Sequence, residues 1–416
     1  MRLLIKNIHQ LIQTKKNNEV VKGKAMKDLP MIENAFVFCD DGKIISFGSM
    51  NEINEAEKNA NEIIDATDCV VGPGWVDSHT HLVFAATREE EFVNRIEGLS
   101  YEEIAKRGGG ILNSAKKLQA ASEQELFDSA WQRLMDVIDM GTVAVEIKSG
   151  YGLTFESELK MLRVIKRLKE KSPIAVKATL LAAHAYPTEF KNNHRGYLDF
   201  IIHELLPAVA KEKLAEYMDV FCEQGFFSVD ETNELLEAAW HYGLPPKIHA
   251  NQLHHSGGVQ IGVKQKAISV DHLECVGEEE IKSLQGSNTM PVMLPSAAFF
   301  LNLPYQPARK IIDAGLPVAL ATDFNPGSSP SGNMNLVISL ACTQMKMLPQ
   351  EAINAATINA AHALQLENEL GTIAFGKTAN LFITQKISSY AVIPYSFGKP
   401  VIDKMVLNGK IWKQNF

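Results

Sequence analysis

Short apolar runs of strand length alternate with helical segments through the middle of the chain. Eight such runs occur, and they are Val70–Val76, Thr142–Ile147, Ile174–Leu181, Met218–Cys222, Lys247–His249, Ala267–Val270, Met290–Leu294 and Val318–Ala321. Helical segments separate most of them, and examples are Ser157–Lys169, Asp230–His241 and Glu278–Leu284. This pattern is typical of a parallel sheet covered by helices, and eight strands predict an α/β fold of the (β/α)8 TIM-barrel type. An open doubly wound sheet is the alternative, but no GxGxxG motif follows the first run.

Both ends of the chain show a different pattern, in which short apolar runs alternate with turns. Near the N-terminus three runs predict strands, with Asp40-Asp41-Gly42 as a hairpin turn, and they are Leu3–Ile5, Ala35–Phe38 and Lys43–Gly48. Residues 379–383 and 404–412 return to this pattern. Because chain termini often lie close together, we expect a small β-sandwich domain of residues 1–66 with 367–416 beside a barrel of residues 67–366.

Composition and charge exclude some classes of protein. The chain has 416 residues, of which 46% are hydrophobic and 22% charged, as is usual for a globular protein with a large core. Lysine and arginine number 41 against 49 acidic residues, which gives a net charge of -8. No run of basic residues with interleaved aromatics occurs, so we expect no nucleic-acid partner.

The cysteines and the apolar segments indicate the compartment. Five cysteines lie far apart without a CxxC pair, which is typical of free thiols in a reducing compartment. The N-terminal segment lacks the features of a secretory signal, and no stretch reaches the ~18 apolar residues that cross a bilayer. We therefore expect a cytoplasmic protein without a membrane partner.

Polar residues at the ends of the predicted strands indicate the chemistry, because active sites of barrels form at the carboxyl ends of their strands. The first run leads to His79 and His81, which point to the same side of an extended segment. The fifth run ends in His249, and the eighth is followed by Asp323. For any one of these residues a local hydrogen-bonding role is a competitive alternative, but for all four together it is not. They predict a metal site.

Three imidazoles and one carboxylate leave an open position for water, which is typical of a catalytic metal site. This set of ligands suits zinc or iron, and we expect one divalent or trivalent ion per chain. A cation held in this way acidifies water and polarises a carbonyl group, so metal-assisted hydrolysis is the predicted class of reaction.

The HxH motif of His79 and His81, together with His249, His272 and Asp323, resembles the amidohydrolase superfamily, and the resemblance spans essentially the whole chain. Three stretches resemble the imidazolonepropionases of histidine degradation more narrowly, and they are Thr87–Phe92, Glu146–Leu153 and Thr322–Ser328. This resemblance implies hydrolysis of the cyclic amide 4-imidazolone-5-propanoate to N-formimidoyl-L-glutamate in the cytoplasm. It also implies a homodimer.

The chemistry of that substrate assigns roles to three residues near the strand ends. Arg88 is placed to bind the flexible carboxylate with two parallel hydrogen bonds, although an arginine in the acidic run Glu89–Glu91 is more often a surface ion-pair partner. Tyr151 can donate a hydrogen bond to a ring nitrogen or to the carboxylate, and His184 can contact the ring. For both residues, simple packing in the core is the alternative.

Further contacts are expected after the eighth strand, where Asn325, Gly327 and Ser328 offer amide and hydroxyl groups to the substrate. His272 is expected to be catalytic, by orienting the attacking water or stabilising the oxyanion.

Two departures from related families bear on the reaction. Some imidazolonepropionases, and the deaminases of this superfamily generally, have Glu three residues after the strand-five histidine, where this chain has Gln252, and a glutamine amide cannot transfer that proton. We therefore assign the general base to Asp323 and a substrate hydrogen bond to Gln252. Relatives with two metals have a lysine after strand four, where this chain has Cys222-Glu223, so one metal is expected. Lys148, which follows strand two, is expected to form an ion pair.

Two other functions remain as alternatives. One is a deaminase or another hydrolase of cyclic amides with the same architecture, and the other is a catalytically silent scaffold of the amidohydrolase type. The glycine run Gly108–Gly110 predicts a flexible loop, with a mobile lid as an intermediate possibility.

Overall fold

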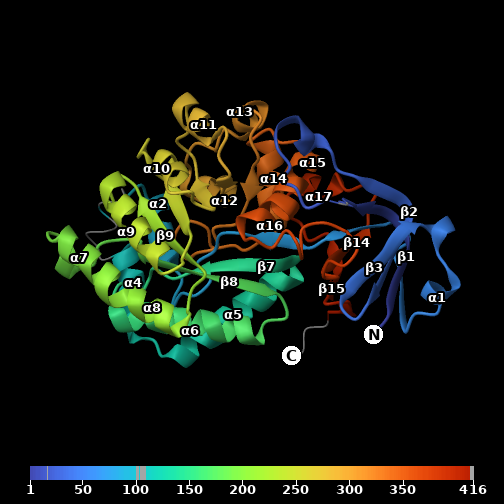
Figure 1. Ribbon diagram of the computed structural model, residues 1–416, viewed down its shortest axis with the longest axis horizontal. Coiled ribbons are helices and arrows are strands. Elements are labelled where there is room, and N and C mark those ends of the chain that lie inside the picture. Colours follow the sequence, from blue (N-terminus) through green and yellow to red (C-terminus); the bar gives the residue numbers. More distant parts are fainter. Residues whose placement is uncertain (16, 100–102, 104–108, 413–416) are drawn as a thin grey trace.

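The computed structural model describes the chain except for residues 16, 100–102, 104–108 and 413–416, so Gly108 of the predicted loop lies outside the described residues. Two sheets organise the fold (Figure 1). The larger unit has eight parallel strands in sequence order, and they are β6 (Trp75–Asp77), β7 (Thr142–Lys148), β8 (Ala175–Ala183), β9 (Tyr217–Cys222), β10 (Pro246–Ala250), β11 (Ser269–His272), β12 (Met290–Met293) and β13 (Ala319–Leu320). All eight predicted runs contribute to this sheet, and the predicted fold class is confirmed.

The first and last strands of this sheet meet just beyond their carboxyl ends, and this closes the barrel. A parallel bridge joins Thr80 to Phe324, the amide of Asp323 donates to the carbonyl of His79 (3.0 Å), and the Asp77 carboxylate accepts from the Thr322 amide and hydroxyl groups (3.0 and 2.6 Å). The closing contacts therefore involve the segments predicted to bind metal.

Helices surround the barrel (Figure 1). Those that follow the strands are α2 (Glu89–Ile96), α4 (Ile111–Ala120), α5 (Glu123–Asp139), α6 (Phe155–Lys171), α7 (His194–Phe200), α8 (Leu206–Glu212), α9 (Val229–His241), α10 (Gly258–Lys264), α11 (Glu278–Leu284), α12 (Pro295–Leu301), α13 (Ala308–Asp313), α14 (Met334–Thr343), α15 (Pro349–Asn354) and α16 (Ala360–Ala363). Ser228 is the N-cap of α9, because its hydroxyl accepts from the amide of Glu231. The apolar faces of the strands and helices form one large buried core.

The two ends of the chain build the second sheet, as the sequence pattern predicts. Its strands are β1 (Leu3–Ile12), β2 (Met31–Asp40), β3 (Lys43–Ser49), β4 (Glu62–Asp65), β5 (Cys69–Pro73), β14 (Leu381–Lys386), β15 (Ile402–Leu407) and β16 (Lys410–Ile411), with α1 (Glu55–Lys58) and α17 (Val392–Tyr395) beside them. The predicted hairpin joins β2 to β3, with Asp41 and Gly42 both at positive φ, as a two-residue turn between twisted strands requires.

One predicted strand is divided between the two sheets. The run Val70–Val76 forms β5, which pairs with β1 and β14 in the terminal sheet, and β6, which pairs with β7 in the barrel. Gly74 lies at the break, where a side chain would meet Val143, with its Cβ only 2.1 Å from a Val143 methyl carbon. The sequence pattern predicts a single strand here because each sheet buries its part of the run, so the apolar residues continue across the break. The domain bounds 1–66 with 367–416 and 67–366 stay a prediction.

The helices of the described chain are all too short or too polar to cross a membrane.

Candidate active site and metal centre

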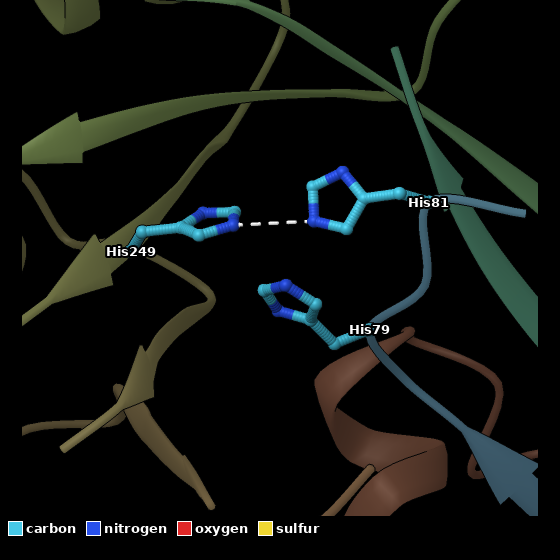
Figure 2. Close-up of side chains that lie close together, drawn as sticks. All are labelled: His79, His81 and His249. Atoms are coloured by element: carbon cyan, nitrogen blue, oxygen red, sulfur yellow. Dashed lines mark hydrogen bonds between the residues drawn. The ribbon is translucent and has the colours of Figure 1, made fainter. Parts of the chain in front are cut away.

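Three histidines converge at the carboxyl end of the barrel. His79 and His81 follow β6, and His249 lies on β10 (Figure 2). One ring nitrogen from each lies within 4.8 Å of the others, and the Nε2 atoms of His81 and His249 are 3.4 Å apart. Asp323, after β13, places its Oδ1 atom 3.5 Å from Nε2 of His79 and 3.6 Å from Nε2 of His81. The structure thus brings together all four predicted metal ligands.

The protonation of these rings fits a bound cation. The Nδ1 atom of His79 lies 2.6 Å from Asp271, and that of His249 lies 2.9 Å from Asp219. Because an ionised carboxylate only accepts hydrogen bonds, each Nδ1 carries the hydrogen and each Nε2 presents a lone pair. The buried Nε2 of His79 has no hydrogen-bond partner among the described residues. Lone pairs facing each other in this way are the arrangement that a metal ion satisfies.

The electrostatic environment keeps these imidazoles neutral, which is the form that binds metal. Burial lowers the pKa of His79 and of His81 well below the ordinary value, and nearby positive charge and other imidazoles lower it further. Burial also lowers the pKa of His249 to about 3, although the Asp219 carboxylate opposes the shift.

A layer of buried charges lies deeper in the barrel, on the strands β7, β9, β10 and β11. We call it the charged layer, and it consists of Glu146, Lys148, Asp219, Lys247 and Asp271. The ammonium group of Lys148 lies 2.9 Å from Glu146 and 2.7 Å from Asp219. That of Lys247 lies 2.6 Å from Glu146, and Lys148 lies 3.6 Å from Asp271. The expected ion pair of Lys148 is therefore confirmed, and two of its carboxylates hold metal-site histidines.

Asp323 is held in a strained conformation by the turn that follows it. Its φ of 55° lies in the left-handed region, which is unusual for a residue with a side chain. The Asn325 side chain donates to the Asp323 carbonyl (2.6 Å) and accepts from the amides of Gly327 and Ser328 (2.7 and 2.8 Å). The Ser328 hydroxyl donates to Oδ2 of Asp323 (3.0 Å). Asn325 and Ser328 thus position the carboxylate, whose pKa burial raises to about 6.

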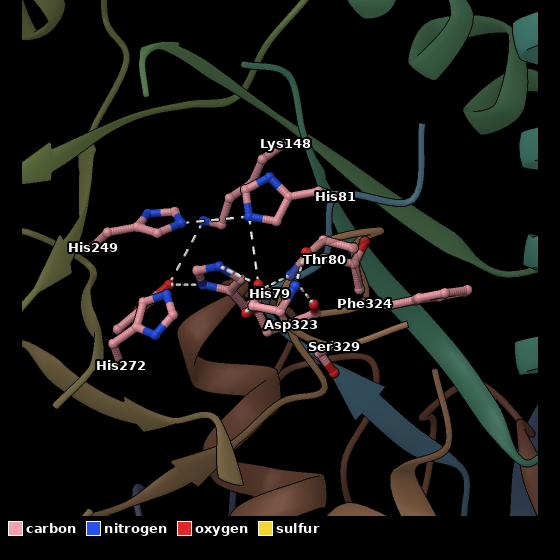
Figure 3. Close-up of polar contacts among 12 residues, drawn as sticks. His79, Thr80, His81, Lys148, His249, His272, Asp323, Phe324 and Ser329 are labelled. Atoms are coloured by element: carbon pink, nitrogen blue, oxygen red, sulfur yellow. Dashed lines mark hydrogen bonds and ion pairs between the residues drawn. The ribbon is translucent and has the colours of Figure 1, made fainter. Parts of the chain in front are cut away.

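His272, at the end of β11, faces the same cluster (Figure 3). Its ring, His79 and Asp323 each offer an atom within 4.8 Å of the others. Nδ1 of His272 lies 3.5 Å from Glu274, and Gln306 donates to Glu274 (3.0 Å). Burial alone lowers the pKa of His272, but the charge and hydrogen bond of Glu274 together with the charges of Asp323 and Asp271 outweigh it, and the net shift is upward.

A cavity of about 450 Å³ opens above the cluster. Its lining includes the predicted catalytic and substrate-binding residues, and they are Arg88, Tyr151, His184, Gln252, His272, Asp323, Asn325, Gly327 and Ser328. Apolar side chains of Phe221, Phe226, Leu301 and Leu303 complete part of the wall. The volume and the mixed lining suit a small heterocycle with a polar substituent.

Arg88 lies at one wall of the cavity, where its side chain is 11% exposed, and not on the surface. It donates a hydrogen bond to Glu91, one turn further along α2, whose other carboxylate oxygen accepts from the amide of Gly110 (2.9 Å). Arg88 also packs against Gly327, where a Cβ atom would lie 2.2 Å from its Nη1. Because Gly327 has no side chain, the guanidinium group of Arg88 can occupy this position.

Tyr151 and His184 also line the cavity. The His184 ring stacks on His81, with centroids 5.3 Å apart, and its Nδ1 lies 3.1 Å from the carbonyl of Gly150. Burial lowers the pKa of His184 to about 4, so the ring is neutral at pH 7. The loop that carries Tyr151 is tied by Glu158, whose carboxylate accepts from the amides of residues 150, 152 and 153.

Gln252 reaches the cavity from the loop after β10, and Glu223 anchors that loop. The Glu223 carboxylate accepts from the amides of Leu253 (2.9 Å) and His254 (3.3 Å), and contacts the His254 ring (3.0 Å). Glu223, which follows β9, therefore anchors the loop that carries Gln252.

Sequence comparisons agree with this geometry. The sequence model of the Amidohydrolase family matches residues 70–412. The chain is 56% identical to proteins named imidazolonepropionase from Christiangramia forsetii and Flavobacterium johnsoniae, in each case over 99% of this chain and 100% of the relative. It is 41% identical to the imidazolonepropionase of Parabacteroides distasonis, over 99% of both chains. The chain belongs to the imidazolonepropionase family of amidohydrolases.

Solved structures share the fold with this family member at much lower identity. A triazine hydrolase variant has a TM-score of 0.74 and 16% identity, and covers 99% of this chain and 94% of its own. The 5-methylcytosine deaminase from Klebsiella pneumoniae has the same TM-score and identity, and covers 100% of this chain and 98% of its own. Both confirm the barrel architecture together with the terminal sheet.

Several residues around the site were missed by sequence reasoning. They are the supporting groups Glu91, Arg95, Glu146, Glu158, Asp219, Lys247, Asp271 and Glu274. A signal exists for some of them, because Glu146 with Lys148 and Lys247 with His249 are polar residues two apart on buried strands. Such spacing points both side chains into the barrel. Glu91 and Arg95 carried no comparable signal.

Proposed function

We propose that this protein hydrolyses 4-imidazolone-5-propanoate to N-formimidoyl-L-glutamate, as the names of its relatives indicate. The observation that carries the proposal is a single cavity with a metal-type cluster at its base and a buried arginine at its wall. A cyclic amide with a flexible carboxylate matches both features. The carboxylate binds Arg88, and the ring carbonyl then faces the histidine cluster.

The ring lies within the cavity. His184 and Tyr151 contact one face, and Gln252 offers an amide that both donates and accepts hydrogen bonds to the ring nitrogens and oxygen. Because His184 is neutral at pH 7, it adds no charge that would bind a second anion. These contacts orient the ring and exclude water from its face.

Asp323 moves the proton in this scheme. One of its carboxylate oxygens accepts a proton from the attacking water and then delivers it to the ring nitrogen that leaves, so the C–N bond breaks without a free anion. His272 donates a hydrogen bond to the carbonyl oxygen as charge builds there, and Glu274 holds the imidazole in place.

We further propose one zinc or iron ion per chain, held by His79, His81, His249 and Asp323. Such an ion supplies a Lewis acid that acidifies water and polarises the ring carbonyl. The facing lone pairs and the paired Nδ1 atoms support this ligand set. The end of β9, the fourth strand of the barrel, has Cys222 and Glu223 in place of a lysine, which supports one ion and not two.

A homodimer and a cytoplasmic location complete the proposal, since the family resemblance implies both and the five cysteines form no disulfide.

Purified protein loaded with zinc or with iron tests the proposal directly. The expected result is loss of the substrate's ultraviolet absorbance together with a product heavier by one water. Release of ammonia would indicate deamination instead, and absence of turnover by both metal-loaded forms would contradict the proposed activity. Elemental analysis should give close to one metal per chain, and two per chain would contradict the single-ion site.

A further inference from the structure

Helix α2 presents three charged side chains to the cavity along one face. Glu91 and Arg95 lie four residues apart in α2, which places them on the same side of the helix, and Arg88 is the N-cap residue three positions before Glu91. All three line the cavity. Glu91 is 7% exposed, whereas its neighbours Glu89 and Glu90 are exposed, so only one carboxylate of the acidic run turns inward.

Arg95 is fixed in place by two contacts. Its Nη2 atom donates to the carbonyl oxygen of Gly327 (3.0 Å). Its guanidinium carbon lies 5.1 Å from the ring centroid of Phe300, in a cation–π contact. Gly327 is therefore held between two arginines, since Arg88 packs against its Cα and Arg95 binds its carbonyl.

The charges at this wall do not cancel. Among the described residues that line the cavity, the arginines are Arg88 and Arg95, and the carboxylates are Glu91 and Asp323. Asp323 belongs to the metal cluster, and Glu91 is bonded to Arg88. Two positive charges and one negative charge leave one positive charge at the wall, which an anionic substituent would neutralise.

We propose that Arg95 is a second specificity-determining residue for the carboxylate of the substrate, acting beside Arg88. Glu91 holds Arg88 in position and cancels one of the two charges. This inference rests on the proposed function, because it concerns how that substrate is selected.

The test compares the acid substrate with its neutral carboxamide, which differs only in the charge of the side chain. Arg95→Met should lower the ratio of kcat/KM for the acid to that for the carboxamide about tenfold, through the KM for the acid, as expected for one charge-assisted hydrogen bond. Arg95→Lys keeps the charge without the planar donors, so its ratio should lie between that of the unchanged protein and that of Arg95→Met. Arg163→Met, which removes an exposed partner of Glu212, is the matched control and should leave the ratio unchanged.

The outcomes separate the two proposals. If Arg95→Met lowers kcat/KM for acid and carboxamide by the same factor, Arg95 only supports the structure and the inference is wrong, while the proposed function stands. If the unchanged protein turns over neither compound, both proposals are overturned. Thermal unfolding of each variant shows whether it folds. If Arg95→Met does not fold, Arg95→Lys serves for the same comparison of the acid with the carboxamide.

Discussion

The charged layer differs from the α2 face of the cavity, which consists of Arg88, Glu91 and Arg95. The two regions surround their lysine and arginine side chains in different ways. In the charged layer Lys148 is fully buried and lies within 3.6 Å of three carboxylates. At the N-cap of α2, Arg88 bonds to one carboxylate, and its Nε atom has no partner among the described residues. Lys148 is therefore surrounded by carboxylates, two of which support the histidines, whereas Arg88 keeps a donor available for a ligand.

This difference has an electrostatic cause. Burial alone lowers the pKa of the Lys148 ammonium, but the charges of Asp219, Glu146 and Asp271 outweigh burial and hold the pKa above its usual range. A buried charge with that many partners is stable only as part of its network. A guanidinium group near water with only some of its donors bonded costs less free energy, and the binding of a carboxylate stabilises it further.

The largest effect should come from breaking the charged layer. Lys148→Met leaves buried carboxylates without their counter-ion, and we expect a loss of ~3–5 kcal/mol in the free energy of unfolding, measured in urea. Arg163→Met breaks an exposed pair with Glu212 and should cost ~0–1 kcal/mol. Equal costs for the two variants would contradict the contrast between buried and exposed pairs.

Breaking the α2 face should instead change binding and leave stability intact. Arg88→Met removes the carboxylate partner, and we expect KM to rise about 10- to 150-fold, which corresponds to ~1.5–3 kcal/mol for a charged hydrogen bond. The urea midpoint should stay close to that of the unchanged protein. A large loss of stability with an unchanged KM would reverse the roles of the two regions.

The link between the charged layer and the metal site can be tested by neutralising one carboxylate. Asp271→Asn keeps the size of the side chain but removes the charge that orients His79, and we expect metal affinity to fall about 10- to 100-fold. Competition with a chelator measures this affinity without any assay of activity. Asp199→Asn, on the exposed surface, is the control, and a similar loss in both variants would show that the layer does not act through His79.

A smaller effect should follow from crowding Arg88. Gly327→Ala places a Cβ atom where Nη1 of Arg88 now lies, 2.2 Å away, so the flexible guanidinium must shift. We expect KM to rise several-fold, less than for Arg88→Met, with little change in kcat. Gly277→Ala, whose Cβ would meet nothing closer than 3.3 Å, should leave KM unchanged.

Lys377 sharpens the comparison because it is buried without a carboxylate bond. It donates to the carbonyls of Glu367 (2.6 Å) and Leu370 (2.8 Å), and burial lowers its pKa to about 8 from 10.5. Between pH 8 and 10.5 the unfolded chain therefore binds more protons, so this group makes the free energy of unfolding rise with pH. Urea unfolding of Lys377→Met across this window should lack that rise, and an identical pH profile for both proteins would contradict the shift.

Sequence alone reached much of the candidate site because strand ends are local features. The order of apolar runs predicts the barrel, and residues that follow such runs lie at one end of it whatever their distance along the chain. That rule predicts that His79, His249 and Asp323 lie together. For Arg88 it left a surface ion pair as the alternative, and burial beside Gly327 decided the matter.

The sequence by itself therefore determined the barrel, the terminal sheet and the convergence of the metal-type residues, because apolar periodicity and alternation of side chains act over a few residues. Only the tertiary structure decided which carboxylates orient the histidines, that the run Val70–Val76 serves two sheets, and that Glu91 and Arg95 turn inward from α2. These features depend on contacts between segments far apart in the chain, where burial and charge are set by neighbours that no local pattern specifies.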